Sequence, residues 1–427
     1  MILIYRIFTN LIYPFLFLFI YYRKMAGKED PIRFKEKLFI SCFNIKKKEN
    51  SKLFWFHAAS IGEFKSIIPI INKLNENHKN LKFLITTTTL SSGNLAKVEL
   101  KKITNAEHRY FPFDINFLIK KFIQLWQPDR VFLVDSEIWP NLILAANEYK
   151  IPIALLNGRL TLKSSKRWML FPNTAEFIFR KLNLCLCSNL ETKNFLERLN
   201  VRKVYYKGNI KLIDKIDQKK IKNTNISYLS NKRFWFAAST HKEEEKFCLN
   251  VHIELKKKFN DIITIIAPRH IERTKKIQTL FKKSNFNTQI LNHNEDIQEG
   301  KEIVIVNYFG AFNTFFKSAK SVFIGKSIIK SLKDDSGQNP IEAAKLNCKI
   351  YHGPYVYNFE DIYKHLANYN ISEKIENHKE LCEYLSVDLE SPYKLKNKNT
   401  NPINDIGEKT LNDTMLIISN FLNDKII

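Results

Sequence analysis

The chain has 427 residues, of which 44% are hydrophobic and 13% aromatic, a composition that argues against long disorder and is sufficient for two ordinary domains. Its formal net charge of +25 favours an acidic partner, such as nucleic acid, an anionic membrane or a phosphorylated substrate. A lysine-rich composition alone would also raise this charge. The six cysteines form no Cys-X-X-Cys pair, and no histidine cluster has metal-ligand spacing. We therefore expect neither a disulfide nor structural zinc.

Residues 1–40 are expected to form a membrane anchor with a basic flank. An apolar and aromatic run covers residues 2–22, interrupted by Arg6, Asn10 and Pro14. Its length is near the minimum for a spanning helix, and no small-residue cleavage site follows it. Basic residues come next, so the positive-inside rule places the rest of the chain in the cytoplasm. Whether the helix spans the bilayer or lies in its interface stays open, because Arg6 and Asn10 are costly at bilayer depth.

Short apolar runs alternate with helical patterns over residues 41–211. Strands are predicted at 53–57, 81–86, 131–135, 153–156, 184–188 and 204–207, and helices at 63–74, 114–126, 139–149 and 192–199. Such alternation favours a parallel sheet with helices on both faces. The first half is therefore predicted to be a Rossmann-like domain.

Residues 212–231 are polar and are interpreted as an interdomain linker. The alternation restarts over residues 232–404, and a last helical segment covers 405–427. Strands are predicted at 233–237, 262–267, 288–291, 303–306, 321–324 and 348–351, and helices at 242–258, 272–283, 310–319 and 340–346. The chain is thus expected to be an α/β protein with two doubly wound domains that bind ligands at the carboxyl ends of their strands.

Polar residues follow several strand ends in the first half. Glu63 closes the segment HAASIGE at the start of a helix, where it could take a proton from an acceptor hydroxyl or simply complement the helix dipole. Asp135 and Glu137 precede a proline, so they could line an active face or only start a helix. Lys211 could offset negative charge on a leaving phosphate or a sugar acid. Lysine is common in this chain, and a structural role for Lys211 is the alternative.

In the second half, Ser239, Thr240 and His241 lie between a strand and an acid-rich helix start. This arrangement is typical of a capped helix and also of an anion site built from backbone N–H groups. Pro268 and Arg269 end the next strand, where an arginine could contact a phosphate or a base.

The sharpest local pattern is the segment NPIE at residues 339–342. Asn339 is predicted to be the N-cap, Pro340 the first helical residue and Glu342 the third, which is close to a capping box. Glycines approach this helix start, so it could hold a phosphate, and Glu342 could accept hydrogen bonds from ribose hydroxyls.

Together these segments resemble the 3-deoxy-D-manno-octulosonic acid (Kdo) transferases of lipid A assembly. The matching segments follow family order over nearly the whole chain: HAASIGE (57–63), ITTTTLSSG (85–93), FPFD (111–114), SEIWPN (136–141), IPIALLNGRL (151–160), GNIK (208–211), ASTHKEEE (238–245), APRH (267–270), NPIE (339–342) and HGPYVYNF (352–359). The set is much more specific than any one of its members.

The resemblance implies a GT-B fold, in which residues 41–211 form the acceptor domain and residues 232–404 the nucleotide-sugar domain. It implies CMP-Kdo as donor, a lipid A precursor (lipid IVA) as acceptor, and inversion without a metal or cofactor. Glu63 would be the general base, with Glu137 and Lys211 supporting the charged transition state. The residues that would hold CMP are Pro268, Arg269, Phe309, Gly310, Ala311, Asn339, Pro340, Ile341 and Glu342, and we add Ser239, Thr240 and His241 as donor-side candidates.

The implied location is the cytoplasmic side of a bacterial inner membrane, with an anionic membrane surface as a partner and no nucleic acid. The oligomeric state is left undetermined. Four residues depart from the family pattern: Lys326 replaces a glycine, Gln338 a histidine, Ala311 an acid and Asp135 a glutamate. Most of these departures fall in the donor half, so they bear on donor affinity and on the identity of the sugar.

Three alternatives stay open at this point. One is a GT-B enzyme or sugar-nucleotide epimerase that uses a UDP-sugar. A second is a basic protein that binds nucleic acid or membrane without catalysis, although no basic strip with interleaved aromatics is visible. The third is an inactive paralogue, suggested by the donor-side departures.

Overall fold

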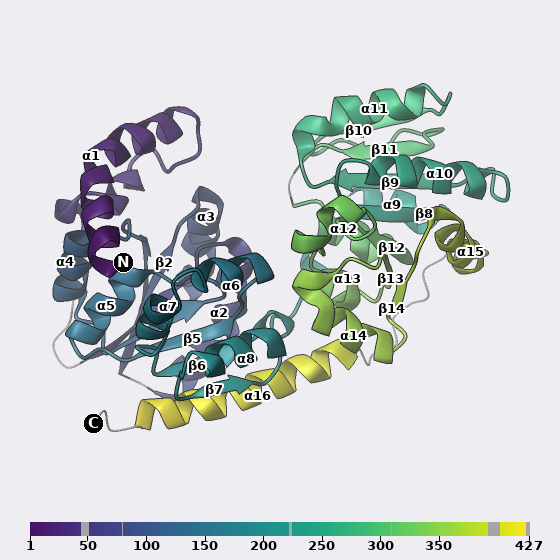
Figure 1. Cartoon of the computed structure of the whole chain (residues 1–427). Helices are drawn as coiled ribbons and strands as arrows, with labels where there is room; N and C mark the ends of the chain where they lie inside the picture. The colour runs from purple at the N-terminus through teal and green to yellow at the C-terminus, as the bar shows by residue number, and fades with distance from the viewer. Residues whose placement is uncertain (44–50, 79, 222–223, 309, 392–401, 424–427) are drawn as a thin grey trace. The chain divides into compact units, whose positions relative to one another are not determined.

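The computed structural model describes residues 1–43, 51–78, 80–221, 224–308, 310–391 and 402–423 (Figure 1). The chain divides into two compact units. The first unit comprises Met1–Asp214 and Ile406–Ile427, and the second comprises Lys215–Asp405.

The first unit is built on a parallel sheet of seven strands in the order β3-β2-β1-β4-β5-β6-β7. The strands are β1 (Lys52–His57), β2 (Leu81–Thr87), β3 (Ala106–Tyr110), β4 (Arg130–Val134), β5 (Ile153–Gly158), β6 (Leu184–Cys187) and β7 (Val204–Tyr206). The central strands are apolar along almost their whole length because helices cover both faces. The strand order reverses between β1 and β4, so their carboxyl ends form the switch point at which such sheets bind ligands.

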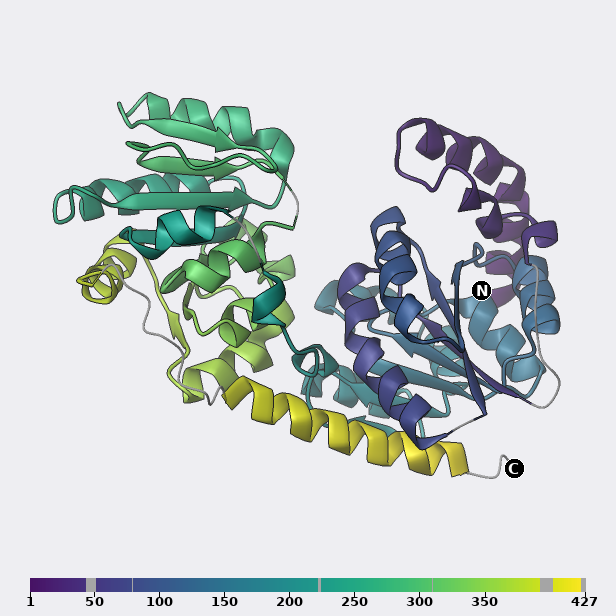
Figure 2. The ribbon, with the colours of Figure 1, turned by 180° about the vertical axis from the view of Figure 1, so that it is seen from behind.

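Helices cover both faces of this sheet. They are α1 (Ile2–Met25), α2 (Ile61–Asn77), α3 (Leu90–Glu99), α4 (Asn116–Trp126), α5 (Pro140–Glu148), α6 (Leu162–Trp168), α7 (Pro172–Phe179), α8 (Leu190–Arg198) and α16 (Pro402–Asn423). The C-terminal helix α16, yellow in Figure 2, buries Met415, Ile418 and Phe421 in the same core as α2. The segment at the end of the chain is therefore part of the first unit's core.

The second unit repeats the architecture with the strand order β10-β11-β9-β8-β12-β13-β14. Its strands are β8 (Phe234–Thr240), β9 (Ile263–Pro268), β10 (Thr288–Leu291), β11 (Ile303–Val306), β12 (Ser321–Ile324), β13 (Lys349–His352) and β14 (Ser372–Lys374). Its helices are α9 (Thr224–Ser230), α10 (Glu244–Lys256), α11 (Thr274–Lys282), α12 (Phe312–Ser318), α13 (Ile341–Lys345), α14 (Glu360–Asn368) and α15 (His378–Asp388). Here the switch point lies between β8 and β12.

Two parallel sheets with alternating helices confirm the predicted fold class. The segment 212–231 contains α9, whose Asn225 is buried and accepts the N–H of Ile297 at 2.7 Å, so most of that segment packs in the second unit.

The prediction missed β3 because its sequence, Ala-Glu-His-Arg-Tyr, lacks an apolar strand pattern. Side chains from the segment after α1 form hydrogen bonds with backbone groups of β3. The Arg33 guanidinium donates to the His108 carbonyl at 2.7 Å, and the Glu36 carboxylate accepts the Tyr110 N–H at 2.8 Å.

Candidate active site

Glu63 is fixed in the first turn of α2 by hydrogen bonds with the residues that precede the helix. Ser60 is the N-cap, and its hydroxyl donates to Glu63 Oε1 at 2.8 Å, while the Ala59 N–H donates to Glu63 Oε2 at 2.7 Å. The residue is only 9% exposed. Glu63 therefore also stabilises the start of α2, the alternative role that the sequence left open. Gly62 is an ordinary helical residue of α2, and a Cβ added there would meet open space.

The surroundings of Glu63 favour its protonated form. Burial raises the pKa of its carboxyl, and the negative charges of Asp135 and Glu137 raise this pKa further. The hydrogen bond from Ser60 and the positive charge of Lys211 act in the opposite direction. A carboxylate with a raised pKa accepts a proton more readily near neutral pH than an ordinary glutamate does.

Glu137 follows the carboxyl end of β4 and is held by two aromatic side chains. Its Oε2 accepts the Trp139 indole N–H at 2.8 Å and lies 3.2 Å from His57 Nε2. His57 is fully buried at the end of β1, where its ring stacks on Phe111 with centroids 3.9 Å apart and its Nδ1 lies 3.0 Å from Thr86 Oγ1. This packing sets the position of the Glu137 carboxylate beside the switch point.

Lys211 is paired with Asp135, the residue that replaces the family glutamate. Asn157 donates to the other oxygen of Asp135, and its own Oδ1 accepts the Ile210 N–H at 3.0 Å. Asp135 and Asn157 have φ angles of 57° and 56°, in the left-handed region that Asp and Asn tolerate better than other side chains. The ends of β4 and β5 and the turn that carries Lys211 are therefore tied together.

The structure thus places the three predicted catalytic residues, Glu63, Glu137 and Lys211, around one switch point of the first unit. Residue-by-residue reasoning missed His57 and Asn157 as parts of this site, and it did not pair Asp135 with Lys211. Both missed residues lie at the end of a strand, and this position was the signal that could have found them.

Removing the Lys211 charge should raise the pKa of Glu63. If Glu63 must be ionised to act as a base, kcat/KM rises with pH as the Glu63 carboxyl loses its proton. Lys211→Met should therefore move this rise, the acidic limb of the pH–rate profile, to higher pH. Initial rates across a pH series measure the shift. An unchanged limb in Lys211→Met would show that another group sets it.

The second unit collects its predicted residues at the ends of β8 and β9. Thr240 is buried and donates to Glu245 Oε1 at 3.2 Å, and Ser239 has a φ of 56°. Burial lowers the pKa of His241 to about 4, so this imidazole is neutral at pH 7. The backbone N–H of Arg269, next to Pro268, donates to the Thr240 carbonyl at 3.0 Å, and the Arg269 side chain is exposed.

A residue outside the predicted set, Glu244, joins the two strands at this switch point. Its buried carboxylate accepts backbone N–H groups from His241 at 2.8 Å, Lys326 at 2.7 Å and Ser327 at 2.9 Å. Lys326, where the family has glycine, adopts a φ of 58°. The family glycine therefore matches a left-handed backbone position, which this chain fills with lysine at a conformational cost.

The helix after β12 starts later than predicted. The helix α13 (Ile341–Lys345) has Pro340 at its N-cap position, one residue later than predicted, and Glu342 makes no capping box in the described structure. The predicted cap bond is nevertheless present, because Asn339 Oδ1 accepts the Ile341 N–H at 3.0 Å. Gly310, with a φ of 86°, and the buried Ala311 precede α12. Phe309 lies outside the described residues.

Gly325→Ala should destabilise the second unit. A Cβ at position 325 would lie 2.6 Å from the Ser239 carbonyl oxygen and 2.7 Å from Glu244 Oε2, so the strand ends would have to separate. Overpacking of this kind costs about 1–3 kcal/mol. Thermal or urea unfolding measures the loss. Gly62→Ala is the matched control, since open space surrounds that helical position and alanine there should stabilise by up to about 1 kcal/mol.

Two Rossmann-like units, each with polar groups at its switch point, give the chain the GT-B fold. Solved structures agree on the fold. The UDP-GlcNAc 2-epimerase of Neisseria meningitidis is 15% identical with a TM-score of 0.59, covering 87% of this chain and 100% of that one. A glycosyltransferase of Rickettsia africae is 14% identical with a TM-score of 0.56, covering 88% of this chain and 100% of that one. In the described part of the chain, no group of three His, Cys, Asp or Glu side chains could hold a metal ion.

Sequence relatives define the family. The family model described as 3-deoxy-D-manno-octulosonic-acid transferase matches residues 33–213. A probable mitochondrial 3-deoxy-D-manno-octulosonic acid transferase of Arabidopsis thaliana is 30% identical over 86% of this chain and 83% of its own length. The 3-deoxy-D-manno-octulosonic acid transferase of Rickettsia prowazekii is 28% identical over 99% of this chain and 100% of its own length. The chain belongs to the 3-deoxy-D-manno-octulosonic acid transferase family and is a glycosyltransferase, as its motifs predicted.

Proposed function

We propose that this enzyme transfers Kdo from CMP-Kdo, with inversion, to a lipid A precursor such as lipid IVA during lipopolysaccharide synthesis. The observation that carries the proposal is the grouping of Glu63, Glu137 and the Lys211–Asp135 pair around one switch point. One carboxylate of raised pKa with a cation near it is what base-assisted glycosyl transfer needs.

In this mechanism the acceptor hydroxyl attacks the ketosidic carbon of Kdo. The new C–O bond forms while the bond to the CMP phosphate breaks, and the hydroxyl proton passes to Glu63. A carboxylate offers about four lone-pair sites. Ala59 and Ser60 use two of them, so capacity for the acceptor proton remains. Glu137 and Lys211 would act on the charges that develop in the transition state.

The CMP group would bind at the strand ends of the second unit, within a nucleotide-sugar domain of residues 232–404. Arg269 and the backbone around Pro268, Gly310 and Ala311 are candidates for the phosphate and the base. The segment from Asn339 through Pro340 and Ile341 to Glu342 and the strand-end residues Ser239, Thr240 and His241 complete the proposed set. Phe309 belongs to the same proposal on sequence grounds. Fixed cations and backbone N–H groups would offset the charge of the departing phosphate.

The acceptor domain, residues 41–211, would work at the cytoplasmic face of the bacterial inner membrane. A lipid acceptor carries its acyl chains in the bilayer, so the enzyme must reach a membrane surface. The apolar helix α1, long enough to cross a membrane by length and composition, and the net charge of +25 support an anionic membrane as partner.

The test is product formation by the purified full-length protein. The protein is incubated with tetraacylated lipid A precursor and either CMP-Kdo or UDP-N-acetylglucosamine, and the lipid products are analysed by mass spectrometry. We expect a mass increase of one or more Kdo units and matching CMP release with the first donor alone. Transfer or epimerisation of the UDP-sugar, or no CMP release in the presence of acceptor, would contradict the proposal.

A further inference from the structure

One face of α1 is attached to the first unit along most of the helix. Near its start, the Tyr5 hydroxyl donates to the buried Asp114 carboxylate at 2.9 Å. In its middle, the Tyr13 hydroxyl donates to the Leu38 carbonyl at 3.0 Å. Near its end, Ile20 is 1% exposed. These attachments are polar as well as apolar, and they recur at helical spacing on a single face.

The opposite face of α1 is apolar and uncovered. Six of its side chains are 60–72% exposed: Leu3, Ile4, Phe8, Leu11, Phe15 and Leu18. Positions 4, 8, 11, 15 and 18 follow the spacing of one helical face. A soluble protein seldom exposes so large a continuous apolar surface, so this face points to a partner.

The attached face restricts how α1 can meet a bilayer. From Tyr5 to Ile20 the attachments cover about 15 residue steps, or about 22 Å of helix axis, against a hydrocarbon core of about 30 Å. If α1 crossed the bilayer, the protein that touches it over this length would enter the hydrocarbon too. That protein includes Asp114 and the charged segment just after α1, whose burial in lipid would be costly.

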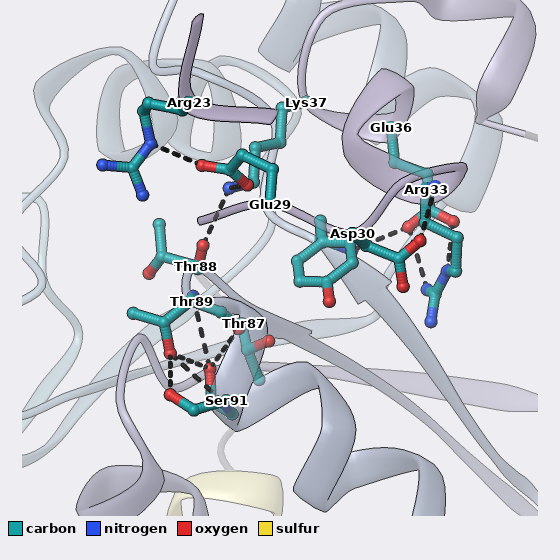
Figure 3. A network of polar contacts seen from close by, with 12 residues as sticks. Arg23, Glu29, Asp30, Arg33, Glu36, Lys37, Thr87, Thr88, Thr89 and Ser91 are labelled. Atoms are coloured by element: carbon teal, nitrogen blue, oxygen red, sulfur yellow. Dashed lines mark hydrogen bonds and ion pairs between the residues drawn. The ribbon is translucent and has the colours of Figure 1, made fainter. Parts of the chain in front are cut away.

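A buried ion network fixes the end of α1 to the unit (Figure 3). Arg23, in the last turn of α1, pairs with Glu29 at 2.6 Å, and Glu29 pairs with Lys37 at 2.5 Å. The side chains of Glu29 and Lys37 are 1% and 6% exposed. Lys37 also donates to the Thr88 carbonyl at 2.8 Å. A swing of α1 away from the unit would therefore break the Arg23–Glu29 pair, in which the Glu29 carboxylate is buried.

We propose that α1 lies in the plane of the membrane, with its outer apolar face in one leaflet of an anionic bilayer, rather than spanning it. The positive charges of Arg23 and Lys24 in its last turn and of Lys28 just beyond favour an anionic bilayer over a neutral one. This inference rests on the proposed membrane association but not on sugar transfer, because the depth of the helix is measured without substrate.

The experiment measures the depth of three outer-face positions. Leu3→Cys, Leu11→Cys and Leu18→Cys are made in a Cys42→Ser background, since the other five cysteines are buried. The full-length proteins carry an environment-sensitive fluorophore and are bound to vesicles of phosphatidylethanolamine and phosphatidylglycerol containing lipids brominated at known depths. We expect the same shallow depth at all three positions, roughly 5–10 Å below the headgroups.

A spanning helix would give a different pattern, with position 11 near the bilayer centre and positions 3 and 18 closer to opposite surfaces. That pattern would overturn the proposal. Absence of quenching at all three positions would also overturn it, because the face would then be covered by protein, such as a second copy of the chain. A CMP-Kdo assay on the same preparations reports separately on the proposed function.

The sidedness of the N-terminus gives a second measurement. Protein added to the outside of preformed vesicles should keep an N-terminal tag open to protease at the same rate with and without detergent. Protection of the tag would indicate a crossing helix. Leu11→Glu should lower vesicle partitioning about tenfold or more, the effect of losing one buried leucine. Val387→Glu, at a 69% exposed apolar position of the second unit, is the matched control and should not change partitioning.

Discussion

Glu63→Gln is expected to lower kcat by about 10²–10⁴-fold, the usual contribution of a positioned general base. The amide cannot take the proton of the acceptor hydroxyl, so the transition state loses its proton acceptor. The measurement is CMP release under saturating CMP-Kdo and lipid acceptor. CMP affinity, measured by calorimetry, should stay within a few-fold of the wild-type value, because Glu63 lies in the first unit and the proposed CMP residues in the second.

The stability of Glu63→Gln separates catalysis from capping. Glutamine has nearly the same size as glutamate, and its Oε1 can accept the Ala59 N–H, so the free energy of unfolding should change by less than about 1 kcal/mol. Glu76→Gln, at an exposed position of the same helix, is the matched control and should keep full activity. Full transfer activity in Glu63→Gln would remove Glu63 from the role of base.

Glu29→Leu is expected to destabilise the protein by about 3–5 kcal/mol, because it leaves the Lys37 ammonium buried without its carboxylate. Burial lowers the pKa of Lys37 even with Glu29 present, so its charge is already costly there. Urea unfolding of the purified protein measures the change. Transfer activity should fall as well, because Lys37 is connected to Glu63 through hydrogen bonds. Lys37 donates to the Thr88 carbonyl, and the Thr88 N–H donates to the Ala59 carbonyl at 3.3 Å. The Ala59 N–H in turn donates to the Glu63 carboxylate.

A double variant tests whether the unpaired Lys37 charge causes the loss of stability. Glu29→Leu/Lys37→Met removes both charges, so it should be more stable than Glu29→Leu alone. Glu99→Leu is the control for loss of a surface pair, since Glu99 and Lys102 have side chains 34% and 66% exposed, and it should cost less than about 1 kcal/mol. A double variant less stable than Glu29→Leu would show that the charges themselves are not what Glu29 balances.

Much of the fold could be predicted from local patterns. Apolar runs such as those of β1 and β9 are recognisable because a central parallel strand is buried on both faces. Two of the four edge strands, β3 and β14, were missed, whereas the edge strands β7 and β10 were predicted. Both missed strands carry charged residues, and contacts with a distant segment stabilise β3, as Arg33 and Glu36 show. The start of α13 was placed one residue early, since the helix begins at Ile341, although Asn339 accepts the Ile341 N–H as a helix cap does.

The candidate site was predicted in part, because the motif residues lie where strands end. The sequence could not show that Lys211 pairs with Asp135, nor that His57 approaches Glu137, since these partners are 76 and 80 residues apart. Glu244 was seen only as a helix-start acid, and its hold on the backbone of Lys326 depends on β8 lying next to β12.

The sequence by itself determined the two α/β halves, the family and the identity of the proposed base, because strand periodicity and ordered motifs are local properties of the chain. Only the tertiary structure decided which charges surround Glu63, and hence the direction of its pKa shift, because desolvation and Coulomb interactions depend on distance in space. The same holds for α1. Its composition is compatible with either orientation in a membrane, and its contacts with Asp114 and Leu38, which come from folding, distinguish them.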